Sequence, residues 1–152
     1  MKSIVIYKSK TGFTKKYAQW IAEDLSADIL DVSKVTMSIL TSYDTIIYGG
    51  SLYAGGIIGV KLIKENINKL KDKKVLVFAT GASPAREDVI NEVRNKNFTQ
   101  EEQKYIKFFY LKKLPQKKRY YKNVISSKHK VFFYPENVDI VGLFRNLTLF
   151  LE

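Results

Sequence analysis

Apolar residues follow two alternating patterns along this chain. Short continuous runs rich in β-branched and aromatic residues predict strands at 3–7, 28–32, 45–48, 74–80 and 105–111. Between most of these runs, apolar residues recur every three or four positions, which predicts helices over 17–25, 58–70 and 83–93. A short apolar run at 131–134 and a last helical pattern reaching Leu151 close the chain. Runs this uniformly apolar are typical of strands that are buried on both faces.

Strands that alternate with helices predict an α/β fold with one parallel sheet covered on both faces. Right-handed crossovers favour a doubly wound arrangement, and five strands favour the spatial order 2-1-3-4-5. We find no internal repeat and no domain boundary, so we expect a single domain over residues 1–152. One poorly patterned segment, about 111–130, is predicted to be a short insert after the fifth strand.

Three loops follow the carboxyl ends of predicted strands, where open α/β sheets bind ligands. The first loop combines hydroxyls with a glycine immediately before a helix: Ser9, Lys10, Thr11, Gly12, Phe13 and Thr14. Backbone N–H groups at a helix start and the helix dipole favour an anion there, so this spacing suits a terminal phosphate. The alternative is an ordinary helix cap, because Ser and Thr are common in that position.

The other two loops are rich in small residues. One contains Ser51, Leu52, Tyr53, Ala54 and Gly55, among glycines that permit φ > 0, and Tyr53 is a candidate for stacking on a planar ring. The other contains Thr80, Gly81, Ala82 and Ser83, whose small side chains leave room for the edge of the same ring. Flexible turns and ordinary strand-to-helix turns are the alternative interpretations of these two loops.

Other chemistries lack the residues that they require. There is no cysteine, which excludes disulfides, zinc–thiolate sites and a cysteine nucleophile, and we expect no metal site. No G-x-x-x-x-G-K-[ST] motif is present, and no G-x-G-x-x-G motif follows the first strand. His129, the only histidine, lies among lysines and is interpreted as a surface residue. We therefore expect no catalytic side chain.

These residues resemble the flavodoxin family in the first loop, in the glycine-rich loop after the third strand and in the Ala-Thr-Gly loop after the fourth. The resemblance implies a flavodoxin-like three-layer sandwich with FMN as the cofactor. It further implies that Ser9–Thr14 bind the FMN phosphate, and that Ser51–Gly55 and Thr80–Ser83 flank the isoalloxazine ring. Such a protein acts in electron transfer or oxidoreduction, either as a carrier or as an FMN-dependent enzyme.

Within that family, the sequence G-G-S-L-Y-A-G-G at 49–56 and the basic insert are most similar to the branch of menaquinone-dependent protoporphyrinogen oxidase. The resemblance therefore leaves two kinds of partner open, a redox protein and a small-molecule substrate or quinone. An alternative of another class is a basic module that binds anions or nucleic acid without flavin.

Positive charge is concentrated late in the chain. The whole chain has 26 Lys and Arg against 15 Asp and Glu, and Lys104–Lys130 contains basic residues but no acidic ones. This segment is a candidate contact for an anionic surface, or only a solvated face. No recognition motif supports nucleic acid as a main partner. No apolar run is long enough to span a membrane, so we expect a cytoplasmic protein, with peripheral membrane contact as the alternative.

Overall fold

The computed structural model describes residues 2–112, 121–125 and 131–135. The chain divides into two compact units, residues 1–113 and 114–152. In the second unit, β7 (Tyr121–Ile125) and β8 (Val131–Pro135) form an antiparallel pair in which Tyr121 lies opposite Pro135. The rest of this unit, including most of the predicted insert and the predicted last helix, lies outside the described residues.

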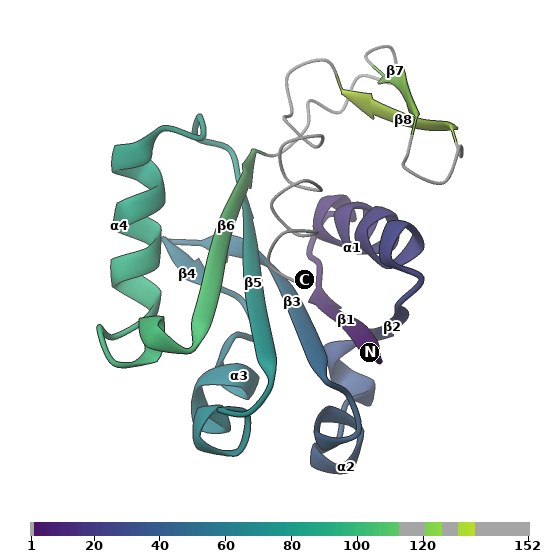
Figure 1. Ribbon diagram of the computed structural model, residues 1–152. Helices are drawn as coiled ribbons and strands as arrows, with labels where there is room; N and C mark the ends of the chain where they lie inside the picture. Colours follow the sequence, from purple (N-terminus) through teal and green to yellow (C-terminus); the bar gives the residue numbers. More distant parts are fainter. Residues whose placement is uncertain (1, 113–120, 126–130, 136–152) are drawn as a thin grey trace. The chain divides into compact units, whose positions relative to one another are not determined.

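The first unit is built on a sheet whose five long strands are parallel (Figure 1). The strands are β1 (Ser3–Lys8), β2 (Asp28–Asp31), β3 (Thr45–Tyr53), β5 (Lys74–Gly81) and β6 (Ile106–Lys112). Their order is β2-β1-β3-β5-β6, so the predicted order 2-1-3-4-5 is confirmed for the five parallel strands. A two-residue strand, β4 (Gly56–Ile57), pairs antiparallel with the end of β3 and was not predicted.

Alternating residues of these strands face opposite sides of the sheet. On one side, Ile4, Ile46 and Val77 belong to the apolar core that includes residues from the helical segments between β2 and β6. The segments that contribute are η1 (Val32–Lys34), α2 (Met37–Thr41), α3 (Lys61–Glu65), η2 (Ile67–Lys69) and α4 (Glu87–Asn97). The 3-10 turn η3 (Glu102–Lys104) follows α4 and buries no residue. On the other side, α1 (Phe13–Leu25) contacts β1 and β3 and buries Tyr17, Ala18 and Ile21.

The helices differ from prediction in length. The predicted helix over 58–70 is a short α-helix, α3, followed by the 3-10 turn η2, while α1 begins four residues before its predicted start. The predicted helix over 83–93 begins only at Glu87 and continues to Asn97. Its N-cap residue, Arg86, is extended, and the Arg86 N–H donates to the Pro84 carbonyl oxygen at 2.9 Å, which is a tight turn and not a helical bond. The start of this helix is therefore four residues later than predicted, at the end of the third loop.

Gly49 and Gly50 do not act as loop glycines, because β3 continues through them to Tyr53. A Cβ on Gly49 would lie 2.0 Å from the ring of Phe78, so this position needs a glycine for close packing. Positive φ values occur instead at Ala54 (49°) and Gly55 (79°), which form the two-residue turn between β3 and β4. Such turns match the twist of the paired strands.

Candidate functional site

Three buried hydroxyls join the three predicted loops. The Thr14 Oγ1 lies 2.7 Å from the Ser51 Oγ and 2.8 Å from the Thr80 Oγ1. We call these three hydroxyls the hydroxyl cluster. The residues that carry them, Thr14, Ser51 and Thr80, are 0%, 3% and 1% exposed. Ser51 and Thr80 meet because they are register partners on the parallel strands β3 and β5, and Thr14 reaches them from the first turn of α1. The loops thus converge at the carboxyl edge of the sheet.

The first loop presents its central residues to solvent. Lys10, Thr11 and Gly12 are exposed, and the Ser9 Oγ accepts a hydrogen bond from the Gly12 N–H at 3.0 Å. Gly12 has a φ of 91°, and a Cβ on this residue would meet no atom within 4 Å, so the space beside it is open. It occupies the N-cap position of α1 and, lacking a side chain, cannot cap the helix. This arrangement suits an anion at the helix start.

Lys10 links the first loop to the second. Its Nζ lies 3.9 Å from the centroid of the Tyr53 ring, within the range of a cation–π contact. Tyr53 is 67% exposed, the highest value among the large apolar side chains of the described residues. A planar ligand therefore has access to this aromatic side chain.

A partly open cavity of about 320 Å³ lies between the second and third loops. Volumes of roughly 300–1,000 Å³ are typical of small-molecule sites. Its walls come from the β3–β4 turn, the third loop, α4 and β6: Leu52, Gly55, Thr80, Gly81, Ala82, Ser83, Val89, Glu92, Val93 and Tyr110. Six of these residues belong to the predicted site. Ser51, which bonds to Thr14, lies outside this wall.

Sequence reasoning missed the contributions of α4 and β6. Tyr110 donates a hydrogen bond to the Ser83 carbonyl oxygen at 2.8 Å and so anchors the third loop, and burial raises the pKa of its hydroxyl. Glu92 also lines the cavity and brings an acidic residue to it, although none of the three loops contains one. Its position on the helix periodicity of α4 was visible in the sequence, but the face that α4 turns to the loops was not.

The described residues show no metal or membrane feature. Among them, no group of His, Asp or Glu side chains is arranged to hold a metal ion. No helix in the described ranges is both long and apolar enough to cross a bilayer.

A model of the flavodoxin domain matches residues 4–125, which include all three loops. The chain belongs to the flavodoxin domain family. Over 100 residues, this flavodoxin domain is 34% identical to an uncharacterised protein of Methanocaldococcus jannaschii. The match covers 63% of this chain and 65% of that relative, which is less than two thirds of its length.

Solved structures agree with the fold. Oxidised flavodoxin 2 of Bacillus cereus is similar with a TM-score of 0.57 at 20% identity, over 78% of this chain and 88% of that one. Two-electron reduced flavodoxin of Megasphaera elsdenii is similar with a TM-score of 0.55 at 16% identity, over 75% of this chain and 88% of that one. Rubredoxin oxygen:oxidoreductase of Desulfovibrio gigas is similar with a TM-score of 0.53 at 19% identity, over 76% of this chain and 31% of that one.

Family membership implies FMN as the cofactor of this flavodoxin domain. The residues present fit that group in two respects. The open space at Gly12 lies at the start of a 13-residue helix, where a phosphate is favoured. The cavity between the second and third loops lies at the same edge of the sheet.

Proposed function

We propose that this chain binds FMN with the three loops at the carboxyl edge of its sheet and transfers electrons through it. The observation that carries the proposal is the hydroxyl cluster, because it brings a phosphate-type loop within hydrogen-bond reach of both predicted ring loops. When bound, FMN supplies the redox chemistry, and the protein binds and orients it.

Each loop has its own part in this proposal. Ser9, Lys10, Thr11, Gly12 and the backbone of Phe13 hold the phosphate. The Ser9 hydroxyl accepts from Gly12, which leaves its own proton for a phosphate oxygen. Thr14, Ser51 and Thr80 join the loops to one another. The ring lies between Leu52, Tyr53, Ala54 and Gly55 on one side and Gly81, Ala82 and Ser83 on the other.

Titration with FMN and with riboflavin tests this proposal. We expect saturable binding of both, visible as a change in flavin fluorescence, with FMN bound more tightly because riboflavin lacks the phosphate. Absence of saturable binding of either flavin would overturn the proposal. Salt-dependent nucleic-acid binding by a flavin-free chain would then favour the basic anion-binding module.

A quinone-dependent enzyme similar to protoporphyrinogen oxidase is the second candidate. The cavity supports it, because a wall that includes Val89 and Val93 from α4 extends beyond the two predicted loops and offers apolar surface. Assays of the FMN-loaded protein with reduced carriers, quinones and protoporphyrinogen distinguish the candidates. Turnover with a quinone and protoporphyrinogen indicates the enzyme, and rapid exchange only with a redox protein indicates a carrier.

The basic segment Lys104–Lys130 is proposed to attract an anionic partner, although most of it lies outside the described residues. Within them, Lys104 is already paired with Glu101 at 2.8 Å, while Lys112 is exposed. Electrostatic attraction acts mainly on the association rate and fades with ionic strength. Five substitutions to Gln should lower that association rate at low salt and leave the affinity for FMN unchanged. The substituted residues are Lys112, Lys113, Lys117, Lys118 and Arg119. A salt-independent rate would leave this segment as a solvated surface.

A further inference from the structure

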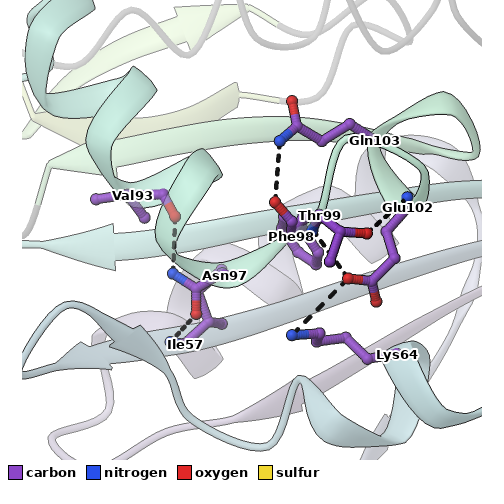
Figure 2. Close-up of polar contacts among 8 residues, drawn as sticks. All are labelled: Ile57, Lys64, Val93, Asn97, Phe98, Thr99, Glu102 and Gln103. Atoms are coloured by element: carbon purple, nitrogen blue, oxygen red, sulfur yellow. Dashed lines mark hydrogen bonds and ion pairs between the residues drawn. The ribbon is translucent and has the colours of Figure 1, made fainter.

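Asn97, the last residue of α4, binds the turn that connects β3 to β4. Its Nδ2 donates to the Gly55 carbonyl oxygen at 2.9 Å, and its Oδ1 accepts from the Ile57 N–H at 2.8 Å. The same Nδ2 also donates to the Val93 carbonyl oxygen, one turn back in α4, at 2.8 Å (Figure 2). The side chain is only 7% exposed, so these bonds are made largely out of water.

The neighbouring residue acts on the same turn. The Lys96 Nζ donates to the Ala54 carbonyl oxygen at 2.6 Å. Lys96 and Asn97 therefore bind two successive carbonyl groups of the turn and one N–H group just after it. We call these two residues the α4 latch. The turn needs such support, because Ala54 has a φ of 49°, a left-handed conformation that is unfavourable for a residue with a Cβ.

The segment that directly follows α4 makes several contacts of its own. In this segment, Thr99 and Glu102 form a reciprocal capping box, with bonds of 2.9 and 3.1 Å (Figure 2). The Glu102 carboxylate also lies 3.9 Å from the Lys64 Nζ of α3. Phe98, between the latch and the capping box, is 2% exposed.

The turn held by the latch forms part of the cavity wall through Gly55. We infer that Asn97, assisted by Lys96, is a positioning residue that holds the β3–β4 turn in the conformation that receives the flavin ring. This inference rests on the proposed function. It assigns a role in ring binding to a residue 42 positions away from the turn in sequence, and it makes no claim on the phosphate.

Asn97→Ala tests the inference, and Asn66→Ala is a matched control. The Asn66 Nδ2 donates to the Leu62 carbonyl oxygen, four residues back, at 2.8 Å, just as Asn97 does to Val93. The two variants thus lose the same kind of local bond, but only Asn97→Ala also releases the turn. Affinities for FMN and riboflavin, the visible absorption bands of the bound flavin and the thermal midpoint should be measured for each.

We expect Asn97→Ala to weaken binding of FMN and riboflavin by the same factor, about tenfold, and to shift the flavin absorption bands. Asn66→Ala should lower the thermal midpoint and leave both affinities and the bands unchanged. Equal effects of the two variants, or a loss confined to FMN, would overturn the inference. A wild-type chain that binds neither flavin would overturn the proposed function and the inference with it.

Lys96→Met is a second variant in case Asn97→Ala does not fold, since Lys96 is exposed. It should weaken the binding of both flavins by a common factor that is smaller than for Asn97→Ala, because only the bond to the Ala54 carbonyl oxygen is lost. The exposed Lys69, converted to Met, controls for the loss of one positive charge. If Lys96→Met and Lys69→Met bind both flavins equally well, the latch has no role in ring binding.

Discussion

Thr11 and Thr14 are three residues apart and have opposite surroundings. Thr11 is exposed on the first loop, while Thr14 is 0% exposed and hydrogen-bonded to Ser51 and Thr80. In the sequence, both were simply hydroxyls of one phosphate motif. The first turn of α1 directs Thr14 toward β3 and β5. Its partners are 37 and 66 residues away in the sequence, so no local sequence pattern predicts these contacts.

We expect the two threonines to differ when each is replaced by Val. Thr11→Val should weaken the binding of FMN by about tenfold and leave the affinity for riboflavin unchanged, since a hydrogen bond to a charged phosphate contributes about 1.5–3 kcal/mol. Thr14→Val should weaken both flavins, because it leaves the two partner hydroxyls without their shared neighbour. Fluorescence titration of each variant with each flavin measures this. Equal losses of both ligands in Thr11→Val would contradict a role in phosphate binding.

The Tyr110 hydroxyl, which anchors the third loop, should make the free energy of unfolding depend on pH. Because burial raises the pKa of its hydroxyl, the unfolded chain releases this proton first as the pH rises. Its contribution to the free energy of unfolding is therefore constant below about pH 10 and declines above it. Tyr110→Phe should cost about 1 kcal/mol at pH 8, through the lost bond to Ser83, and show a shallower decline above pH 10.

Urea denaturation of both proteins between pH 8 and 11 measures that difference. Tyr43 and Tyr48 remain in the variant, and their pKa values are also raised, that of Tyr43 by its bond to Asp28 and that of Tyr48 by burial. A residual decline is thus expected in Tyr110→Phe. Parallel profiles for the two proteins would show that the Tyr110 hydroxyl ionises alike in the folded and unfolded states.

At the scale of elements, all five strands of the parallel sheet were predictable, whereas the two-residue strand β4 and the short helix α2 were not. Strands such as β5 are uniformly apolar because both faces are buried, which gives a signal over seven or eight residues. The helix α2 and the strand β4 have five and two residues, too few to show a period. The β3–β4 turn was hidden for the same reason, and the first of its two left-handed residues is an alanine, which rarely adopts this conformation.

That turn should respond in opposite directions to two small substitutions. Ala54→Gly removes the cost of a left-handed alanine and should raise stability by up to about 1 kcal/mol. Gly55→Ala should lower it by about 1 kcal/mol or more, because its φ is 79° and the new Cβ would lie 2.8 Å from the Lys96 Nζ. Thermal unfolding of the flavin-free proteins measures both effects. A destabilised Ala54→Gly would mean that this turn is not held in the left-handed region in solution.

At the scale of the whole molecule, charge around the site is mixed. Lys10 contacts Tyr53, Lys96 contacts the β3–β4 turn, and Glu92 lies on the cavity wall. The three loops alone suggested a site without negative charge, and only the packing of α4 against them brought Glu92 to it. The balance still favours positive charge near the proposed ring position.

Reduction adds negative charge to the flavin, so nearby cations favour it and nearby anions oppose it. We expect Glu92→Gln to raise the midpoint potential of bound FMN and Lys10→Gln to lower it. Each shift should amount to tens of millivolts, on the order of 0.5–1 kcal/mol per electron for a partly screened charge. Spectroelectrochemical titration measures both, and wild type should lie above an acidic electron-carrier flavodoxin in the same buffer. Shifts of the same sign in both variants would refute the electrostatic account.

The hydroxyl cluster joins residues that are 37 and 66 positions apart in the chain. During synthesis, the phosphate loop exists long before Thr80 has left the ribosome, and the binding site is complete only after β5 has joined the sheet. Contacts with this sequence separation are costly to close and tend to form late in folding. A cofactor bound across such contacts stabilises the folded protein more than the transition state, so we expect bound FMN to slow unfolding and to change the folding rate little.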